Sequence, residues 1–154
     1  MSDDITLIKQ TLAAYCHRLD RGTADEVADL FAEDAILRPY YDGKYECEGR
    51  DAVRDWYRFY HEKMGATVSN LKHLTHSTEV ILNGDSADSV TYLTAYFTTK
   101  EDGVAYQAQG TYFDIMVRHG ERWLIKDRRI EVEFITSMGK AISEMKPMGY
   151  PDAE

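Results

Sequence analysis

The stretch NLKHLTHSTEVIL, residues Asn70–Leu82, has the character of a β-strand and is followed directly by the turn sequence NGDS. Two more turn sequences that contain glycine, KEDG and RHGE, separate the β-like runs that come after it. Each of these turns suits a hairpin. The second half of the chain is therefore predicted to form a four-stranded antiparallel meander, with strands near residues 69–82, 87–99, 104–118 and 122–134.

The first half of the chain has the spacing of helices instead. Apolar residues recur every three or four positions between Asp4 and Leu19, which makes one face of a helix. Thr23, with Glu26 three residues later, is the pattern of an N-cap and predicts a second, short helix. The segment GRDAVRDWYRFYHEKM, residues 49–64, returns to helical spacing and predicts a third helix.

A short extended region lies between the second and third of these helices. An Asp42-Gly43 turn joins its two runs, and Pro39 predicts a position at the edge of the sheet. Helices followed by a meander indicate an α+β fold. Because a curved, mostly antiparallel sheet must bury its concave face under the helices, we expect a cone-shaped α+β barrel with a cavity at its mouth.

The 154 residues are predicted to form a single domain, residues 1–154, because no Pro-, Gly- or Ser-rich linker divides them. The core is expected over about residues 4–134. The tail, residues 135–154, is expected either to form one short helix or to stay mobile, since Pro147 and Pro151 limit it.

Composition excludes several classes of partner. A net charge of -9 repels phosphate backbones, so nucleic acid is not expected to bind. No apolar run approaches the roughly 20 residues that span a bilayer, and no signal peptide opens the chain, so we expect a cytoplasmic protein without a membrane partner. Two cysteines are too few for a disulfide framework. No P-loop, dinucleotide fingerprint or zinc spacing occurs, and neither a cofactor nor a metal is expected.

Four segments together resemble a known family: YCHRLDRGTADEVADLFAEDA, GRDAV, KHLTHSTEVILNGDSA and GTYFDIMVRHGERWLIKDRR. They are similar, in the same order, to the SnoaL-like branch of the nuclear-transport-factor-two-like superfamily, over about residues 4–134. The resemblance implies the cone-shaped fold predicted above. It leaves the activity open, because the branch contains cyclases, dehydratases, dehydrohalogenases, isomerases and members without an assigned activity.

The resemblance also implies a site. Proteins of the scytalone dehydratase and hexachlorocyclohexane dehydrochlorinase type remove a proton from a small hydrophobic substrate with a histidine that an aspartate orients. Those positions correspond here to His73 and Asp20, while Ser77 stands where an asparagine often contacts the substrate. The steroid isomerases of the superfamily place an oxyanion tyrosine at Tyr15. Their two catalytic carboxylates would fall near Pro39 and Gly110, so their usual chemistry is not expected.

The two histidines of the opening stretch lie three residues apart. Successive side chains of a strand point to opposite faces, so His73 and His76 cannot converge on one metal ion. His73 is predicted to face the cavity, as a general base or as a core histidine bonded to a tyrosine. A carboxylate at Asp20 would fix its tautomer and stabilise the imidazolium that proton abstraction forms. Tyr15, near Asp20 on the same helix, is either a proton donor or a core residue.

The sequence also supports predictions for residues outside the His73–Asp20 pair. Asp114 and Arg128 flank the RHGE turn at similar distances, and we expect a structural cross-strand pair. Cys16 and His17 diverge on their helix, which disfavours a Cys-His nucleophile. The tyrosines of the extended region and of the meander are candidates to line the substrate pocket: Tyr40, Tyr41, Tyr92, Tyr96 and Tyr112.

The sequence thus favours a cofactor-independent lyase or isomerase, dehydratase-like or cyclase-like, that acts on a small hydrophobic oxygenated molecule by His-Asp acid/base catalysis. The alternative is a non-catalytic module of the same fold that binds a small molecule or serves in assembly. A weaker third candidate is the small subunit of a ring-hydroxylating dioxygenase. In each case the outward face of the sheet needs a cover, so a homodimer or higher homo-oligomer is expected.

Overall fold

The computed structural model describes residues 3–142 and 147–149. Three helices and six strands follow one another along the chain. They are α1 (Asp4–Arg21), α2 (Ala24–Ala28), β1 (Phe31–Pro39), β2 (Cys47–Glu48), α3 (Arg50–Thr67), β3 (Val68–Asn83), β4 (Ser86–Thr99), β5 (Val104–His119) and β6 (Arg122–Lys140). The predicted α+β class and the four strands of the meander are confirmed.

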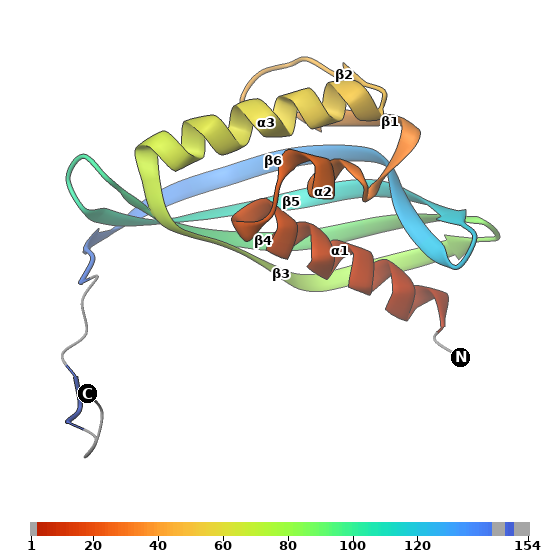
Figure 1. Cartoon of the computed structure of the whole chain (residues 1–154). Coiled ribbons are helices and arrows are strands. Elements are labelled where there is room, and N and C mark those ends of the chain that lie inside the picture. The colour runs from red at the N-terminus through yellow and green to blue at the C-terminus, as the bar shows by residue number, and fades with distance from the viewer. Residues whose placement is uncertain (1–2, 143–146, 150–154) are drawn as a thin grey trace.

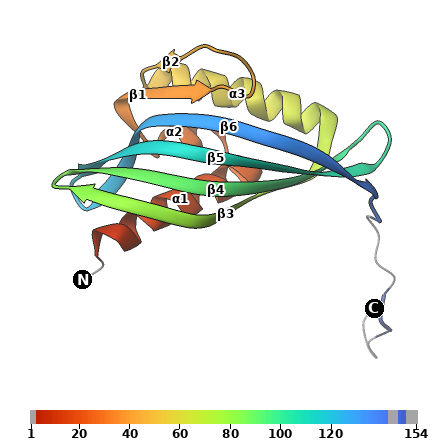
Figure 2. The ribbon, with the colours of Figure 1, turned by 180° about the vertical axis from the view of Figure 1, so that it is seen from behind.

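The strands form a single sheet in the order β2-β1-β6-β5-β4-β3. β1 runs parallel to β6, and every other neighbouring pair is antiparallel. The helices lie on one side of this curved, unclosed sheet (Figure 1), and the view from behind shows its other side without a helix (Figure 2). The helices thus cover the concave face of the sheet, as the order of helices and strands predicts.

Local signals set the helix ends. The side chain of Asp3 accepts a hydrogen bond from the Thr6 N–H and caps α1. Thr23 and Glu26 form the complete capping box that their spacing predicts, so the loop between α1 and α2 is only two residues long. This tight connection fixes the C-terminal turn of α1, which carries Asp20, against the rest of the fold.

One prediction about the strands is wrong, and another, the edge position of Pro39, holds for that residue but not for the whole of β1. β6 continues to Lys140 rather than ending near Phe134, because residues of β5 from Val104 onward need a partner and the tail supplies it. Pro39 lies at the end of β1, which has β6 on one side and β2 on the other. β2 pairs only with Ile36 and Leu37, so it does not require a donor at Pro39. Residues 143–146 and 150–154, where the expected tail helix would fall, lie outside the described residues.

The core fills the end of the cone where α1 begins. Ile8, Met116, Trp123 and Ile125 are buried there between α1 and the concave face of the sheet. The Thr11 hydroxyl ties the helix to the sheet by donating to the carbonyl oxygen of Trp123, at 2.7 Å. Toward the C-terminal end of α1 the core opens into a cavity.

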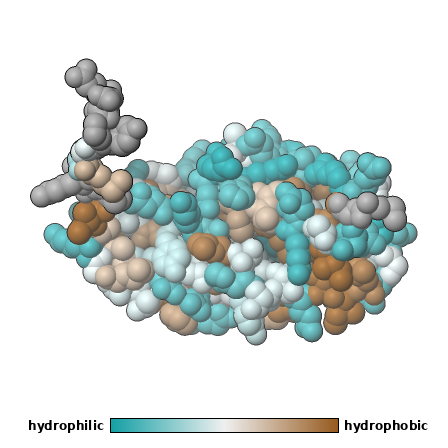
Figure 3. All heavy atoms as spheres, turned by 90° about the horizontal axis from the view of Figure 1, so that it is seen from below, coloured by the Kyte–Doolittle hydropathy of each residue, from teal (hydrophilic) through white to brown (hydrophobic). Residues whose placement is uncertain are grey.

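Several large apolar side chains remain exposed outside this core. The convex face of the sheet carries Leu74, Tyr92, Tyr96 and Ile115. Seen from below, apolar atoms also gather at the end of the molecule where the N-terminus lies (Figure 3). None of the described helices is both long and apolar enough to cross a membrane.

Candidate active site

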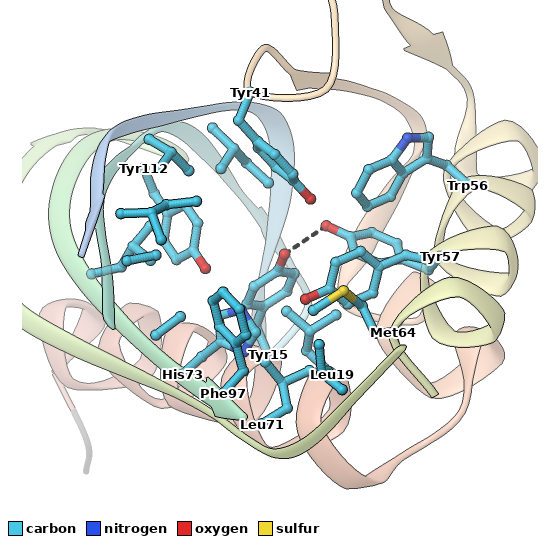
Figure 4. Close-up of a pocket in the computed structure, with 18 of the residues that line it drawn as sticks. Tyr15, Leu19, Tyr41, Trp56, Tyr57, Met64, Leu71, His73, Phe97 and Tyr112 are labelled. Atoms are coloured by element: carbon cyan, nitrogen blue, oxygen red, sulfur yellow. Dashed lines mark hydrogen bonds between the residues drawn. The ribbon is translucent and has the colours of Figure 1, made fainter. Parts of the chain in front are cut away.

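A cavity of about 630 Å³ lies between the concave face of the sheet, the C-terminal half of α1 and the inner face of α3. Nearly all of its wall is apolar or aromatic, and the polar side-chain atoms in it belong to tyrosines, one histidine and Trp56, whose indole N–H donates to the Tyr45 hydroxyl (Figure 4). Its lining residues are Tyr15, Leu19, Tyr41, Trp56, Tyr57, Tyr60, Met64, Val68, Leu71, His73, Leu93, Ala95, Phe97, Ala108, Tyr112, Ile130, Val132, Phe134 and Ile135.

Asp20 and His73 are in direct contact at the wall of this cavity. The Oδ1 atom of Asp20 lies 2.6 Å from Nδ1 of the imidazole, and its Oδ2 accepts the backbone N–H of the same histidine at 2.8 Å. The two side chains are only 13% and 9% exposed. Because an ionised carboxylate only accepts hydrogen bonds, Nδ1 carries the proton. In the neutral ring the second nitrogen, Nε2, is then the proton acceptor, and no hydrogen bond to it occurs within the described part of the chain.

The sheet topology explains this double contact. β3 is an edge strand that pairs only with β4, and the N–H of His73 points away from β4. Asp20 satisfies this unpaired edge donor and the ring donor together. His61 of α3 bonds through Nε2 to the Leu19 carbonyl oxygen at 2.8 Å, which anchors the turn next to Asp20.

Two irregularities bracket His73 on its strand. The register with β4 shifts between Ser69 and Lys72 and again between His76 and Thr78. Between these bulges the strand is regular, so His73 faces the cavity while His76 faces the convex side, where its Nε2 lies 3.1 Å from the Thr94 hydroxyl. The predicted opposition of the two imidazoles is confirmed. Within the described residues no cluster of three metal-ligating side chains occurs.

Tyr15 and Tyr57 face each other across the cavity floor, with their hydroxyl oxygens 2.7 Å apart. Both side chains are buried, and burial raises the pKa of each phenol above its usual value. The hydroxyls therefore stay protonated at neutral pH. Two hydroxyls that share one hydrogen bond have a second O–H left over, and this proton is available to an oxygen atom of a ligand.

Tyr57 was not among the predicted site residues, and neither were Trp56 and Tyr60. The helical spacing of α3 places these aromatic residues on its buried face, but that spacing is equally typical of core packing. Trp56 and Tyr60 stack with ring centroids 5.5 Å apart and form the α3 wall of the cavity. The cavity opposite these residues is what shows that they line a binding site and do not simply pack in the core.

The predicted pocket tyrosines divide between the two sides of the sheet. Tyr41 and Tyr112 line the cavity. Tyr92 and Tyr96 do not, because Leu93, Ala95 and Phe97 take the inward positions of β4 and leave the even-numbered residues outside. Tyr92 is 58% exposed on the convex face.

Two further candidates also lie outside the cavity. The ammonium nitrogen of Lys44 lies over the ring of Tyr40, 4.2 Å from the ring centroid. Tyr40 lines a separate hollow on the convex side of the sheet. Ser77 is exposed at the second bulge of β3 with a positive φ of 41°. Its side chain is not among those that line the cavity, so the place that the family resemblance gave it is not at the cavity wall here. At Gly110, where the steroid isomerases would carry an acid, a Cβ would collide with the carbonyl oxygen of Glu131.

Asp114 and Arg128 form the predicted cross-strand pair. They are direct neighbours on β5 and β6, and the guanidinium donates to both carboxylate oxygens at 2.7 Å. Both side chains are completely buried on the concave side of the sheet. Cys16 is also buried, and its burial raises the pKa of the thiol to about 11, which makes it a poor nucleophile at neutral pH.

Comparison with known proteins agrees with this architecture. A candidate scytalone dehydratase of Novosphingobium aromaticivorans superposes with a TM-score of 0.75 at 20% identity, covering 96% of this chain and 94% of that one. A hexachlorocyclohexane dehydrochlorinase, LinA type 2, gives a TM-score of 0.75 at 12% identity and covers 95% of both chains. At these identities the similarity establishes the fold alone.

A sequence relative is a phenylalanine ammonia-lyase of Nostoc punctiforme, 26% identical over 106 residues. The match takes in 63% of this chain but only 19% of the lyase, so the chain spans about a fifth of that protein's length. A family model, described as the SnoaL-like domain, matches residues 1–129. The chain therefore belongs to the SnoaL-like family, with the nuclear-transport-factor-two-like fold.

Proposed function

We propose that this protein is a cofactor-independent lyase or isomerase, dehydratase-like or cyclase-like, that acts on a small, largely hydrophobic, oxygenated molecule. His73 is the general base, Asp20 orients it, and Tyr15 donates a proton or a hydrogen bond to a substrate oxygen. One observation carries the proposal: the carboxylate of Asp20 holds both the ring Nδ1 and the backbone N–H of His73, at 2.6 and 2.8 Å.

The chemistry follows from the charges in the dyad. When Nε2 of His73 accepts a proton from carbon, the imidazole becomes a cation, and the adjacent Asp20 carboxylate stabilises it. The same proton can then leave with a departing hydroxyl group, which is a dehydration, or return to another carbon, which is an isomerisation. A neutral imidazole is a common general base in enzymes and needs no metal for this role.

The tyrosines supply the complementary role. Removal of a proton next to a carbonyl group places negative charge on its oxygen, and a hydrogen-bond donor that waits there lowers the barrier. The spare O–H of the Tyr15–Tyr57 pair is such a donor at the cavity floor. A substrate would then have an acidic C–H near His73 and an oxygen near Tyr15.

The wall of the cavity limits the class of substrate. Among its lining residues His73 is the one with an ionisable side chain other than the tyrosines, and the rest are apolar or aromatic. A charged ligand would lose its hydration there without gaining a partner. We therefore propose an uncharged, ring-containing molecule, and no role for nucleic acid.

A ligand screen tests the binding half of this proposal. Phenolic, steroidal and polyketide-like compounds are added at saturating concentration and the melting temperature is measured. A ligand at 100 times its Kd stabilises the folded state by about 2.7 kcal/mol. Turnover of each hit is then followed by chromatography, and hits that bind without turnover in wild-type protein would favour the non-catalytic binding module.

We also propose that the protein forms a homodimer or higher homo-oligomer through the convex face of the sheet. The helices cover the other face only, and the convex face exposes Leu74, Tyr92, Tyr96 and Ile115. A face of this kind on both copies can form a self-complementary interface.

A further inference from the structure

A fully buried cation lies directly behind the tyrosines of the cavity. The guanidinium carbon of Arg128 is 4.1 Å from the ring centroid of Tyr15 and 4.1 Å from that of Tyr112. Both tyrosines line the cavity, whereas Arg128 does not, and its side chain has no exposed surface. A ligand in the cavity would therefore meet Arg128 only through the two rings.

The ion pair of Arg128 is arranged asymmetrically. Its Nε and Nη2 donate to Asp114, while Nη1 is buried and makes no hydrogen bond to any described residue. The carboxylate thus occupies one edge of the guanidinium, and the two aromatic rings take its other contacts. The contact of the guanidinium with both rings is thus an interaction separate from its ion pair with Asp114.

The effect of the cation on the tyrosines has a definite sign. Burial raises the pKa of Tyr15, and Arg128 opposes this rise, as does the hydrogen bond from Tyr57. Arg128 also acts to lower the pKa of Tyr112 and Tyr57 against their burial. Cys16, the other group that acts on Tyr15, works in the opposite direction. The positive end of the pair therefore faces the phenols.

On the basis of the proposed function, we infer that Arg128 is a positioning residue for the reaction: its buried charge acts through Tyr15 to strengthen the hydrogen bond that the tyrosine pair donates to a ligand oxygen. As negative charge develops on that oxygen, the donating phenol becomes partly phenolate-like. A fixed cation next to the ring stabilises this change, and it does so strongly because the surroundings exclude water.

A titration of Tyr15 in the ligand-free protein tests this inference. Tyr15 is replaced by 3,5-difluorotyrosine, whose phenol ionises at lower pH, and the ionisation midpoint is followed by absorbance. Two variants are compared with the wild-type pair: Arg128→Gln, which removes the cation, and Asp114→Asn, which leaves the cation unbalanced. Arg128→Lys, which keeps the charge, is the control.

The electrostatic role predicts shifts of opposite sign. The midpoint should rise by about one pH unit or more in Arg128→Gln, fall in Asp114→Asn, and change least in Arg128→Lys. A purely structural pair predicts that both neutralising variants loosen the core, admit water and move the midpoint in the same direction. Shifts of equal sign, or no shift in either variant, would overturn the inference.

If a single variant does not fold, the double variant Arg128→Gln/Asp114→Asn decides the question. It keeps a hydrogen-bonded neutral pair of similar shape, which cores tolerate better than one unpaired charge. Its midpoint should rise, because the cation is the member that contacts Tyr15, and an unchanged midpoint would refute the inference. Since the titration needs neither ligand nor turnover, opposite shifts without any catalytic activity would count against the proposed function and not against the role of Arg128.

Discussion

The concave and convex faces of the sheet carry the same residue types in different surroundings. His73 and His76 lie three residues apart on β3, yet one is bonded to a buried carboxylate at the cavity wall and the other meets a threonine hydroxyl on the exposed side. The tyrosines divide in the same way: Tyr112 is 2% exposed, and Tyr92 is 58% exposed.

This difference teaches that residue type alone does not define a site here. Burial against α1 and α3 gives the concave side a low dielectric, in which hydrogen bonds and charges act strongly. On the convex side water screens the same groups. Substitutions matched across the two faces therefore test the proposals better than single variants do.

The largest expected effect is on the chemical step. His73→Gln keeps most of the side-chain volume but removes the proton acceptor, so turnover of a substrate found in the screen should fall by roughly 10²–10⁴. His76→Gln, the matched change on the convex face, should leave turnover unchanged. Steady-state kinetics checks both variants, and circular dichroism checks that they fold. An unaffected rate in His73→Gln would end the general-base proposal.

Asp20→Asn should give a smaller loss, because the shape remains while the charge that stabilises the imidazolium is removed. Both residues serve one proton transfer, so the double variant with His73→Gln should be little slower than His73→Gln alone. A double-variant cycle on kcat measures this. Fully multiplicative losses would show that the two side chains act independently.

Asp114→Asn should lower stability without abolishing ligand binding, because it leaves the Arg128 charge unpaired inside the core. Breaking one partner of a buried ion pair costs about 3–5 kcal/mol. Asp88→Asn on the exposed side of β4 is the matched control and should change the free energy of unfolding by less than about 0.5 kcal/mol. Urea denaturation compares them. A variant that keeps its stability but loses all binding would instead place Asp114 in the site.

Alkaline pH should destabilise the fold through its buried acids. Cys16 has a pKa of about 11 when folded and 9.0 as an ordinary thiol. Between these values the folded state binds more protons than the unfolded state. The stability that the protonated thiol contributes is therefore fully present below pH 9 and is lost as the pH rises toward 11. The slope for this one group approaches about 1.4 kcal/mol per pH unit. Urea midpoints from pH 7 to 11 measure it, and Cys16→Ala should flatten the slope; an equally steep slope in that variant would contradict the assignment.

The smallest effect on the fold is expected at the convex face. Tyr92→Asp should reduce self-association while leaving the melting temperature of the monomer nearly unchanged, because the side chain is mostly exposed within one chain. Phe59→Asp on the exposed side of α3 is the control, since Phe59 is 47% exposed and lies away from this face. Light scattering at micromolar concentration reads the oligomeric state. Wild-type protein that is monomeric there would remove the proposal of a homo-oligomer.

Much of the fold could be predicted from local patterns. Helical spacing, the Thr23–Glu26 capping box and three glycine turns are short-range signals, and each leads to the observed element because its physics lies within a few residues. The pairing of Asp114 with Arg128 also follows from their similar distances to one hairpin turn, although a register shift between Ile115 and Met116 is needed to bring them opposite each other. The extension of β6 to Lys140 could not be predicted in this way, because it depends on pairing with the first residues of β5 and not on a local pattern.

The contact between Asp20 and His73 was expected from resemblance to a family rather than from the residues themselves. What the sequence by itself determined is which groups can do acid/base chemistry and which segments carry them. Tertiary structure alone decided which tyrosines face the cavity, because the inward positions of β4 are taken by Leu93, Ala95 and Phe97 and packing leaves space opposite Trp56 and Tyr57. It also placed Arg128 against Tyr15, a contact between residues 113 positions apart that no local pattern encodes.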